Sequence, residues 1–254
     1  MTLPDFNFET FRKDWDLVCV LGPTASGKTR LAVSLARELS SAMGTGEGCE
    51  IISADSRQVY RGMDIGTGKD LADYGDIPYH LIDIAESGEQ YNVFRFKEDF
   101  QAAFQSIVSR GNFPILCGGT GLYINSIARD YDFRSSRPLS EDRGSAPSGL
   151  RIYFIGTSVS REVRNARIDA RLDARLQEGM VEEIKGLLDS GVPAERLISY
   201  GLEYKFVTLY LLGELGYEEM RLRLSTAIHQ FAKRQMTWFR GMERSGVLIH
   251  WVEV

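Results

Sequence analysis

The sequence is poor in cysteine and histidine, with three of each in 254 residues. The cysteines, Cys19, Cys49 and Cys117, are odd in number and lack the close spacing of metal ligands, which argues against a disulfide framework and a zinc site. Two of them fall in apolar, strand-like runs. We therefore expect buried, reduced thiols, as in a cytoplasmic protein. The histidines stand apart from one another and are assigned no chemistry.

Long apolar runs and an excess of positive charge are also missing. No stretch reaches the roughly 20 apolar residues that a membrane-spanning helix needs. Residues 1–16 lack the apolar centre of a signal peptide. We expect a cytoplasmic protein with no membrane partner. The net charge of −5 argues against a chain built throughout to bind a polyanion, and a hydrophobic fraction of 43% suffices for one large core.

One complete motif is present near the N-terminus. Residues 22–29 read G-P-T-A-S-G-K-T and match the phosphate-loop pattern G-x-x-x-x-G-K-[ST]. The apolar run 17–21 precedes it like a buried strand, and an amphipathic helix is expected over 29–39. In such a loop, backbone N–H groups wrap an anion, Lys28 adds a full positive charge, and Thr29 is placed to hold Mg²⁺. The predicted ligand is a di- or triphosphate, bound by Gly22, Pro23, Thr24, Ala25, Ser26, Gly27, Lys28 and Thr29.

Alternating strand-like and helix-like segments follow the phosphate loop. Strands are expected at 51–54, around 80–84 and at 113–117, and a helix over about 93–110. This alternation predicts an α/β fold of the P-loop NTPase type, a parallel sheet flanked by helices. Ligands bind at the carboxyl ends of the strands in such sheets. The phosphate loop, Asp55 and Thr120 each come directly after a strand and should therefore converge at one edge.

The second half of the chain is predicted to be mostly helical. A polar segment at 132–149 is interpreted as a linker inside a single domain that spans 1–254. After it, the pattern predicts a strand at 151–156, helices over 161–190, 202–212 and 217–241, and a last short strand at 249–252 that closes the sheet.

The segment D-S-R-Q-V-Y at 55–60 carries the second group of polar residues. The Asp55 carboxylate is interpreted either as an outer partner of magnesium or as the base for an acceptor held beside the phosphates. A structural alternative makes Asp55 the N-cap of the following turn. Ser56 and Gln58 are placed to hydrogen-bond a heteroaromatic acceptor.

Two glycine-rich segments complete the expected site. In G-G-T-G-L-Y at 118–123, the glycines permit close backbone approach to a ligand and Thr120 offers a hydroxyl, although the glycines also suit a tight strand-to-helix turn. Residues 66–69 read G-T-G-K and are interpreted as a mobile loop on the substrate side.

Six segments together resemble the tRNA dimethylallyltransferase (isopentenyltransferase) family. They are G-P-T-A-S-G-K-T (22–29), D-S-R-Q-V-Y (55–60), G-M-D-I-G-T-G-K (62–69), Y-H-L-I-D (79–83), G-G-T-G-L-Y (118–123) and K-R-Q-M-T-W-F-R (233–240). They occur in the family's order and span nearly the whole chain. The resemblance implies transfer of a dimethylallyl group from dimethylallyl diphosphate to N6 of an adenosine next to the anticodon in tRNA, with release of pyrophosphate.

The same resemblance implies roles for individual residues. Asp55 would be the general base for the acceptor amine, Thr120 would line the reaction channel, and Lys28 with Mg²⁺ on Thr29 would stabilise the departing pyrophosphate. The acceptor nucleotide would be bound by Asp55, Ser56, Arg57, Gln58 and Thr120. Arg167 and Arg171, on one face of an arginine-rich helix, are candidates for further diphosphate contacts.

Two features depart from the family pattern. Bacterial members carry a helical insertion after G-G-T-G-L-Y that helps to grip the anticodon stem-loop, and only the short segment 132–149 stands there in this chain. Glu203-Tyr204-Lys205 occupies a position where the family more often has Gly-Tyr-Lys. Without the insertion, RNA would have to be held by the basic helices.

Other functions stay open on the sequence alone. Cytokinin-forming relatives transfer the same group to free AMP, ADP or ATP, although the D-S-R-Q and T-W-F-R segments favour the tRNA branch. A P-loop small-molecule kinase would use ATP through the same loop with Asp55 as base, and would consume ATP, which a prenyltransferase does not. The intact Lys28, Thr29 and Asp55 argue against a non-catalytic remnant.

Overall fold

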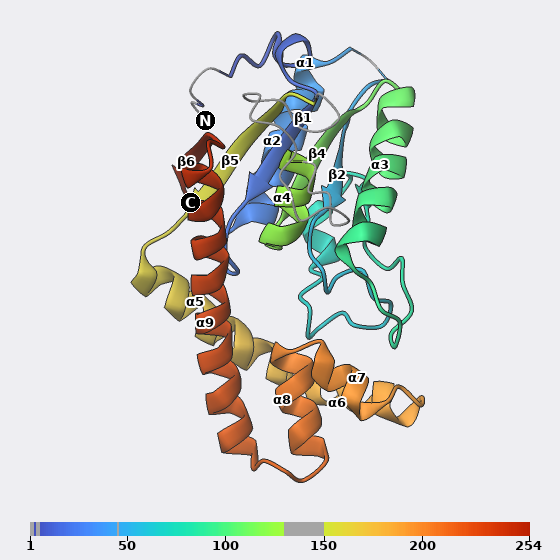
Figure 1. The fold of residues 1–254 in the computed structure, drawn as a ribbon, viewed down its shortest axis with the longest axis vertical. Coiled ribbons are helices and arrows are strands. Elements are labelled where there is room, and N and C mark those ends of the chain that lie inside the picture. The colour runs from blue at the N-terminus through green and yellow to red at the C-terminus, as the bar shows by residue number, and fades with distance from the viewer. Residues whose placement is uncertain (1–2, 4–5, 45, 130–149) are drawn as a thin grey trace.

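The computed structural model describes residues 3, 6–44, 46–129 and 150–254. They form a parallel sheet, covered by helices on both faces, above a helical lower part (Figure 1). The described strands have the order β3-β2-β4-β1-β5-β6. Their bounds are β1 (Leu17–Leu21), β2 (Cys49–Ser53), β3 (Tyr79–His80), β4 (Phe113–Gly118), β5 (Ile152–Ser158) and β6 (Ile249–Glu253). The expected α/β fold is confirmed, including the closing strand at the C-terminal end. The expected linker at 132–149 lies outside the described residues.

Alternating side chains of the buried central strand β1 supply both halves of the core. Leu17, Cys19 and Leu21 face one side of the sheet, and Val18 and Val20 face the other. Both faces are covered because a parallel sheet carries its crossover helices on either side. The helices of the first half are α1 (Phe11–Asp14), α2 (Lys28–Ala42), the 3₁₀ turn η1 (Leu71–Tyr74), α3 (Val93–Ser109) and α4 (Gly121–Arg129).

Helices of the second half build the lower part of the molecule. They are α5 (Arg161–Gln177), α6 (Met180–Asp189), α7 (Ala194–Ser199), α8 (Leu202–Leu211) and α9 (Tyr217–Arg244). In Figure 1, α9 runs from this lower part up to β6 and joins the two parts. The single helix expected over 161–190 is in fact two helices, because Gly179 has a left-handed φ of 103° between α5 and α6.

Two other sequence expectations differ from the structure. Strand β3 shares only His80 with the segment expected as a strand around 80–84, because Leu81 and Asp83 have positive φ angles of 62° and 55° that are incompatible with an extended chain. The short helix α7 was not expected.

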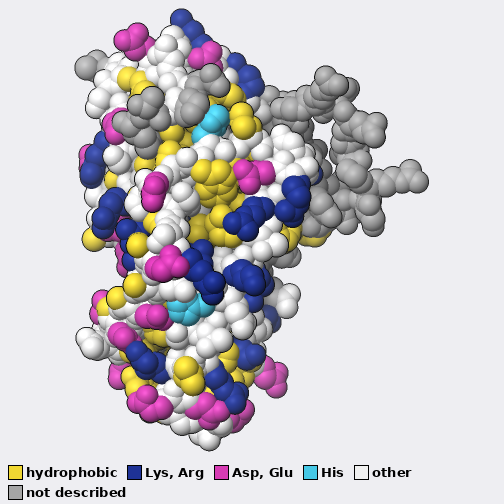
Figure 2. Space-filling view, turned by 90° about the vertical axis from the view of Figure 1, so that its left-hand side faces the viewer, with side chains coloured by type: hydrophobic (Ala, Val, Ile, Leu, Met, Phe, Trp, Pro, Cys, Tyr) yellow, Lys and Arg dark blue, Asp and Glu magenta, His cyan; other side chains and the backbone are white. Residues whose placement is uncertain are grey.

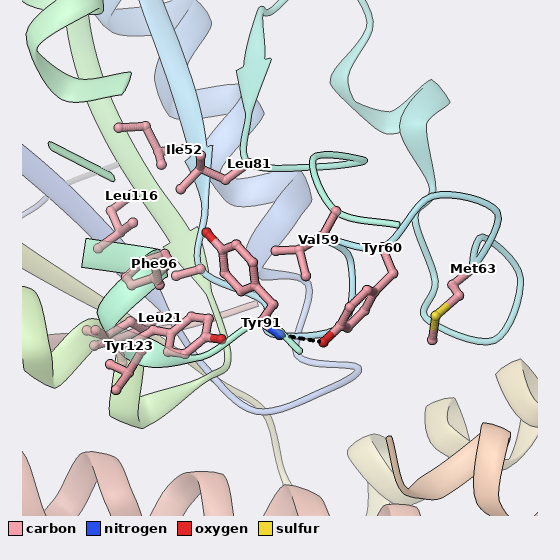
Figure 3. Packing of buried hydrophobic residues seen from close by; sticks show 14 of the residues in the cluster. Leu21, Ile52, Val59, Tyr60, Met63, Leu81, Tyr91, Phe96, Leu116 and Tyr123 are labelled. Atoms are coloured by element: carbon pink, nitrogen blue, oxygen red, sulfur yellow. Dashed lines mark hydrogen bonds between the residues drawn. The ribbon is translucent and has the colours of Figure 1, made fainter. Parts of the chain in front are cut away.

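The D-S-R-Q-V-Y segment is anchored by its last two residues. Val59 and Tyr60 are buried in the core together with Leu81 and Tyr91, and the Tyr60 hydroxyl accepts a hydrogen bond from the backbone N–H of Tyr91 at 3.1 Å (Figure 3). The polar residues just before Val59 therefore lie on a loop whose far end is fixed in the core.

Candidate functional site

A polar pocket lies at the carboxyl ends of the central strands. Its walls come from the phosphate loop, the loop after β2, residues 67–70, the β4 end, α5 and α9. The lining residues are Thr24, Lys28, Thr29, Ser53, Asp55, Arg57, Gln58, Thr67, Gly68, Asp70, Tyr74, Cys117, Gly118, Arg171, Phe231 and Gln235. The phosphate loop and Asp55 thus share one cavity, while Ser56 and Thr120 are outside this set and contact each other next to Asp55.

The phosphate loop is held in shape by contacts from α9, α5 and β5. The Thr24 N–H donates to Oε1 of Gln235 at 2.8 Å, and the Arg171 guanidinium donates to the Thr24 hydroxyl. The buried Ser26 hydroxyl donates to the Pro23 carbonyl at 2.8 Å and lies 2.6 Å from Oγ1 of Thr157. The Ser26 side chain is thus engaged inside the protein, which leaves the backbone of the loop to meet a ligand.

Positive charge at the loop comes from Lys28, at the start of α2. Burial lowers the pKa of Lys28, and this effect is opposed by the nearby Cys117 and Asp55. Burial also raises the pKa of the Cys117 thiol to about 11, although Lys28 and a hydrogen bond with Thr29 act in the opposite direction. Cys117 therefore stays a thiol near neutral pH, and Asp55 is the carboxylate beside the Lys28 ammonium.

Asp55 lies in the loop after β2, and its two carboxylate oxygens differ in their hydrogen bonding. Oδ1 accepts a hydrogen bond from the backbone N–H of Arg57 at 3.0 Å, so the capping interaction weighed from the sequence is present. Oδ2 accepts no hydrogen bond from the described residues and Asp55 lines the pocket. One carboxylate therefore both shapes its own loop and offers an acceptor oxygen to a ligand.

The neighbours of Asp55 are tied to other parts of the site. The Ser56 N–H donates to Oγ1 of Thr120 at 3.0 Å, and the two hydroxyls are 3.3 Å apart. The Gln58 amide donates to the Gly68 carbonyl at 2.9 Å and accepts from the Ser53 hydroxyl at 3.3 Å. Ser56, Gln58 and Thr120 thus join the loops around the pocket to one another.

Arg57 forms a buried ion pair rather than a free cationic group. Its guanidinium donates to Glu203 of α8, and its Cζ lies 5.8 Å from the ring centroid of Phe231. Burial acts to lower the pKa of Arg57, but Glu203 and Asp55 outweigh it and the pKa is raised. The charge of Arg57 is therefore balanced inside the protein.

The two arginines expected at the diphosphate occupy different places. Arg171 lines the pocket, and burial together with the nearby Arg175 lowers its pKa to about 10. Arg167 is exposed, lies outside the pocket lining, and has both terminal nitrogens 3.5 Å from the Val254 carbonyl.

Gln235 and Glu203 were not predicted as site residues. Nε2 of Gln235 donates to the Gly119 carbonyl at 2.8 Å, so this one side chain joins the phosphate loop to the G-G-T-G turn. A Cβ on Gly119 would lie 2.4 Å from that nitrogen and would displace the Gln235 amide from its present position. Gln235 lies on the buried stripe of α9 between Ala232 and Phe239. A polar residue in an apolar helical stripe is the sequence pattern that would have revealed it.

Known proteins are similar to this chain in sequence. The IPP transferase family model matches residues 58–147 and 133–242. The chain belongs to the IPP transferase family. It is 50% identical to tRNA dimethylallyltransferase 1 of Porphyromonas gingivalis over 290 aligned positions, which cover 93% of each chain. It is 43% identical to tRNA dimethylallyltransferase 2 of Bacteroides fragilis, over 100% of this chain and 94% of the relative.

Solved structures of this family share the fold. The full-length tRNA isopentenylpyrophosphate transferase of Bacillus halodurans matches with a TM-score of 0.80 and 30% identity, over 94% of this chain and 89% of that one. A eukaryotic dimethylallyltransferase acting on tRNA is 22% identical, with a TM-score of 0.76 over 93% of this chain and 73% of that one, a likeness of fold. The resemblance carried by the six sequence segments is confirmed.

Proposed function

We propose that this chain transfers a dimethylallyl group from dimethylallyl diphosphate to N6 of an adenosine next to the anticodon in tRNA, releasing pyrophosphate. The observation that carries the proposal is the shared pocket, in which a phosphate loop and a carboxylate oxygen with no partner among the described residues face the same space. The relatives named tRNA dimethylallyltransferase support the tRNA acceptor. Because tRNA is the substrate, we place the reaction in the cytoplasm.

The donor side would bind the diphosphate. Backbone N–H groups of residues 25–29 at the N-terminus of α2 would contact its oxygens, while the Thr24 N–H is bound to Gln235, and Lys28 and Arg171 would supply positive charge. The described residues contain no cluster of three or more His, Cys, Asp or Glu side chains able to hold a metal. The site suits Mg²⁺, which often takes few protein ligands and several phosphate oxygens, here with the Thr29 hydroxyl. When bound, Mg²⁺ would neutralise charge on the departing pyrophosphate.

The acceptor side would activate the adenine amine. As N6 forms its bond to the allylic carbon, the bond from that carbon to the diphosphate oxygen breaks and pyrophosphate leaves with the electron pair. The N6 proton passes to Oδ2 of Asp55, which makes Asp55 the general base. Ser56, Gln58 and Thr120 would hold the loops against which the adenine rests, through the hydrogen bonds that join them.

We infer that this chain is a compact, single-domain member of its family over 1–254. Its alignments with the relatives extend over 290 and 309 positions, more than its own 254 residues, so the relatives carry residues with no counterpart here. The two family-model matches overlap at 133–147, which supports placing the missing insertion at the linker 132–149.

RNA would then be held by the basic helices. Exposed cations on α5 and α9 include Arg161, Arg167, Lys233, Arg234, Arg240 and Arg244. Figure 2 shows Lys and Arg side chains gathered midway down one face of the molecule. Such a patch suits the phosphate backbone of RNA in spite of the net charge of −5.

The proposed function is tested by offering labelled dimethylallyl diphosphate and Mg²⁺ to the purified protein, with unmodified tRNA, AMP, ADP or ATP in parallel reactions. We expect label on tRNA and unchanged ATP. Label on free nucleotides alone would replace the tRNA acceptor with the nucleotide acceptor, and conversion of ATP to ADP would favour the kinase.

A further inference from the structure

Glu183, on α6 in the helical lower part of the molecule, accepts hydrogen bonds from the loop at residues 64–69, which belongs to the part that contains the sheet. Its Oε2 accepts hydrogen bonds from the N–H groups of Asp64 and Ile65 at 2.8 and 2.6 Å, and its Oε1 accepts from Gly66 N–H at 3.0 Å. Three successive N–H groups that converge in this way form an anion-binding concavity, here filled by the protein's own carboxylate. Hydrogen bonds to a charged acceptor are stronger than those between neutral groups.

A tyrosine fixes the Glu183 carboxylate from the opposite side. The hydroxyl of Tyr204, on α8, donates to Oε1 of Glu183 at 2.8 Å. Tyr204 is fully buried, and burial together with Glu183 raises its pKa, so the hydroxyl keeps its proton and remains a donor. The carboxylate therefore has four donors, three from the loop and one from α8.

The loop at residues 64–69 leads directly into the pocket. Thr67, Gly68 and Asp70 line the pocket, and the Gly68 carbonyl accepts the hydrogen bond from Gln58 on the acceptor-side loop. At the loop's other end, the buried Lys69 ammonium binds the Tyr60 carbonyl and the carboxylates of Asp64 and Asp83. The loop expected to be mobile is thus anchored on two sides.

From these contacts we propose that Glu183 is a positioning residue for the acceptor half of the site, the loop at residues 55–58 that is expected to bind the acceptor nucleotide. It acts through residues 64–68, whose Gly68 carbonyl sets the position of Gln58. The phosphate loop is held by other residues, Gln235, Thr157 and Arg171, so the donor half does not depend on Glu183. The proposal rests on the proposed function, since it concerns the acceptor of that reaction.

The test compares Glu183→Gln with Glu182→Gln, the exposed neighbour on the same helix. The amide of Glu183→Gln keeps the side-chain length but removes the charge and one acceptor oxygen. We expect kcat/KM for tRNA to fall by about tenfold or more, while the Kd for dimethylallyl diphosphate stays within about twofold of wild type. Glu182→Gln should match wild type, and Glu183→Asp, which restores the charge on a shorter arm, should recover part of the loss.

Hydrogen exchange of the amides of Asp64, Ile65 and Gly66 gives a second readout that does not need activity. These amides should exchange slowly in wild type and in Glu182→Gln, and faster in Glu183→Gln. Unchanged exchange, unchanged kcat/KM for tRNA, or an equal loss of diphosphate binding would each overturn the proposal. If wild type itself transfers no prenyl group to tRNA, the proposed function fails, and the exchange rates decide the anchoring on their own.

Discussion

At the scale of single residues, the pocket contains side chains that face a ligand and side chains that hold them in place. Lys28 and Oδ2 of Asp55 belong to the first kind, and Arg171 belongs to both, because it lines the pocket and also donates to the Thr24 hydroxyl. Arg57 and Ser26, both expected to bind substrate, also hold the site in place. The Arg57 guanidinium donates to Glu203, and the Ser26 hydroxyl contacts Pro23 and Thr157. A motif such as D-S-R-Q-V-Y contains residues of both kinds, and the motif alone does not distinguish them.

Partners far away in sequence decide which kind a residue belongs to. Arg57 and Glu203 are separated by 146 positions, and Thr24 and Gln235 by 211. No local pattern connects these pairs, because it is the sheet and α9 that bring them together. The chemistry of Asp55 and the phosphate loop could therefore be proposed from the sequence, but the buried contacts that shape the pocket could not.

Glu50, near the start of β2, offers a stability prediction that is independent of the reaction. Its buried carboxylate binds Arg110 at 2.8 Å, Asn112 at 2.5 Å and His80 at 2.6 Å. Burial acts to raise the pKa of Glu50, but Asn112, His80 and Arg110 together outweigh it and lower the pKa. Glu50→Gln should reduce the free energy of unfolding at pH 7 by about 1–3 kcal/mol.

The pH dependence of that loss follows from the direction of the shift. A carboxyl group whose pKa is lowered by folding stabilises the fold at pH values above its ordinary pKa, which is 4.5 for Glu50. It loses this contribution as the pH falls through its pKa in the folded state. Urea unfolding at several pH values should therefore show the difference between wild type and Glu50→Gln shrinking below pH 4.5. A difference that stays constant with pH would contradict the assigned cause. Glu98→Gln, at an exposed position of α3, is the control.

At the scale of elements, α9 has a buried face and an exposed face with different roles. Ile228, Ala232, Gln235 and Phe239 form its buried stripe, with Gln235 reaching the phosphate loop, while Lys233 and Arg240 are among its exposed cations. A 3.6-residue period places these two sets on different faces. One helix thus supports the phosphate loop and presents positive charge to solvent.

The Lys233→Ala variant tests the outward face of α9. Removing one phosphate contact should weaken tRNA binding for all sequences alike and lower the slope of log Kd against log salt concentration by about 1. The KM for dimethylallyl diphosphate should not change. Binding titrations at several salt concentrations measure the slope, with Lys13→Ala in α1 as the control. An unchanged salt slope would remove Lys233 from the RNA-binding face.

Element types were easier to predict than element ends. Hydrophobic periodicity identified the buried strands, the long helices and the last strand. It did not show the break at Gly179 or the early end of β3, because these depend on positive φ angles at Gly179, Leu81 and Asp83. Backbone conformations of that kind follow from the packing of the loop, which a periodic pattern does not contain.

At the scale of the whole molecule, the pocket lies where the sheet meets the helical part. The sheet supplies the phosphate loop and Asp55, and the helical part supplies Arg171, Phe231 and Gln235. Ion pairs and hydrogen bonds cross this boundary at Arg57–Glu203 and at Glu183. Among the described helices, none combines the length and the apolar composition that a bilayer-spanning segment needs.

The most direct test of the account compares wild type with Asp55→Ala, using labelled dimethylallyl diphosphate, Mg²⁺ and unmodified tRNA, followed by digestion and identification of the labelled nucleoside. We predict that wild type labels N6 of an adenosine next to the anticodon, and that Asp55→Ala binds the diphosphate normally but transfers at least about a hundredfold more slowly. Transfer by Asp55→Ala at the wild-type rate would contradict the role of Asp55 as the base on which this account depends.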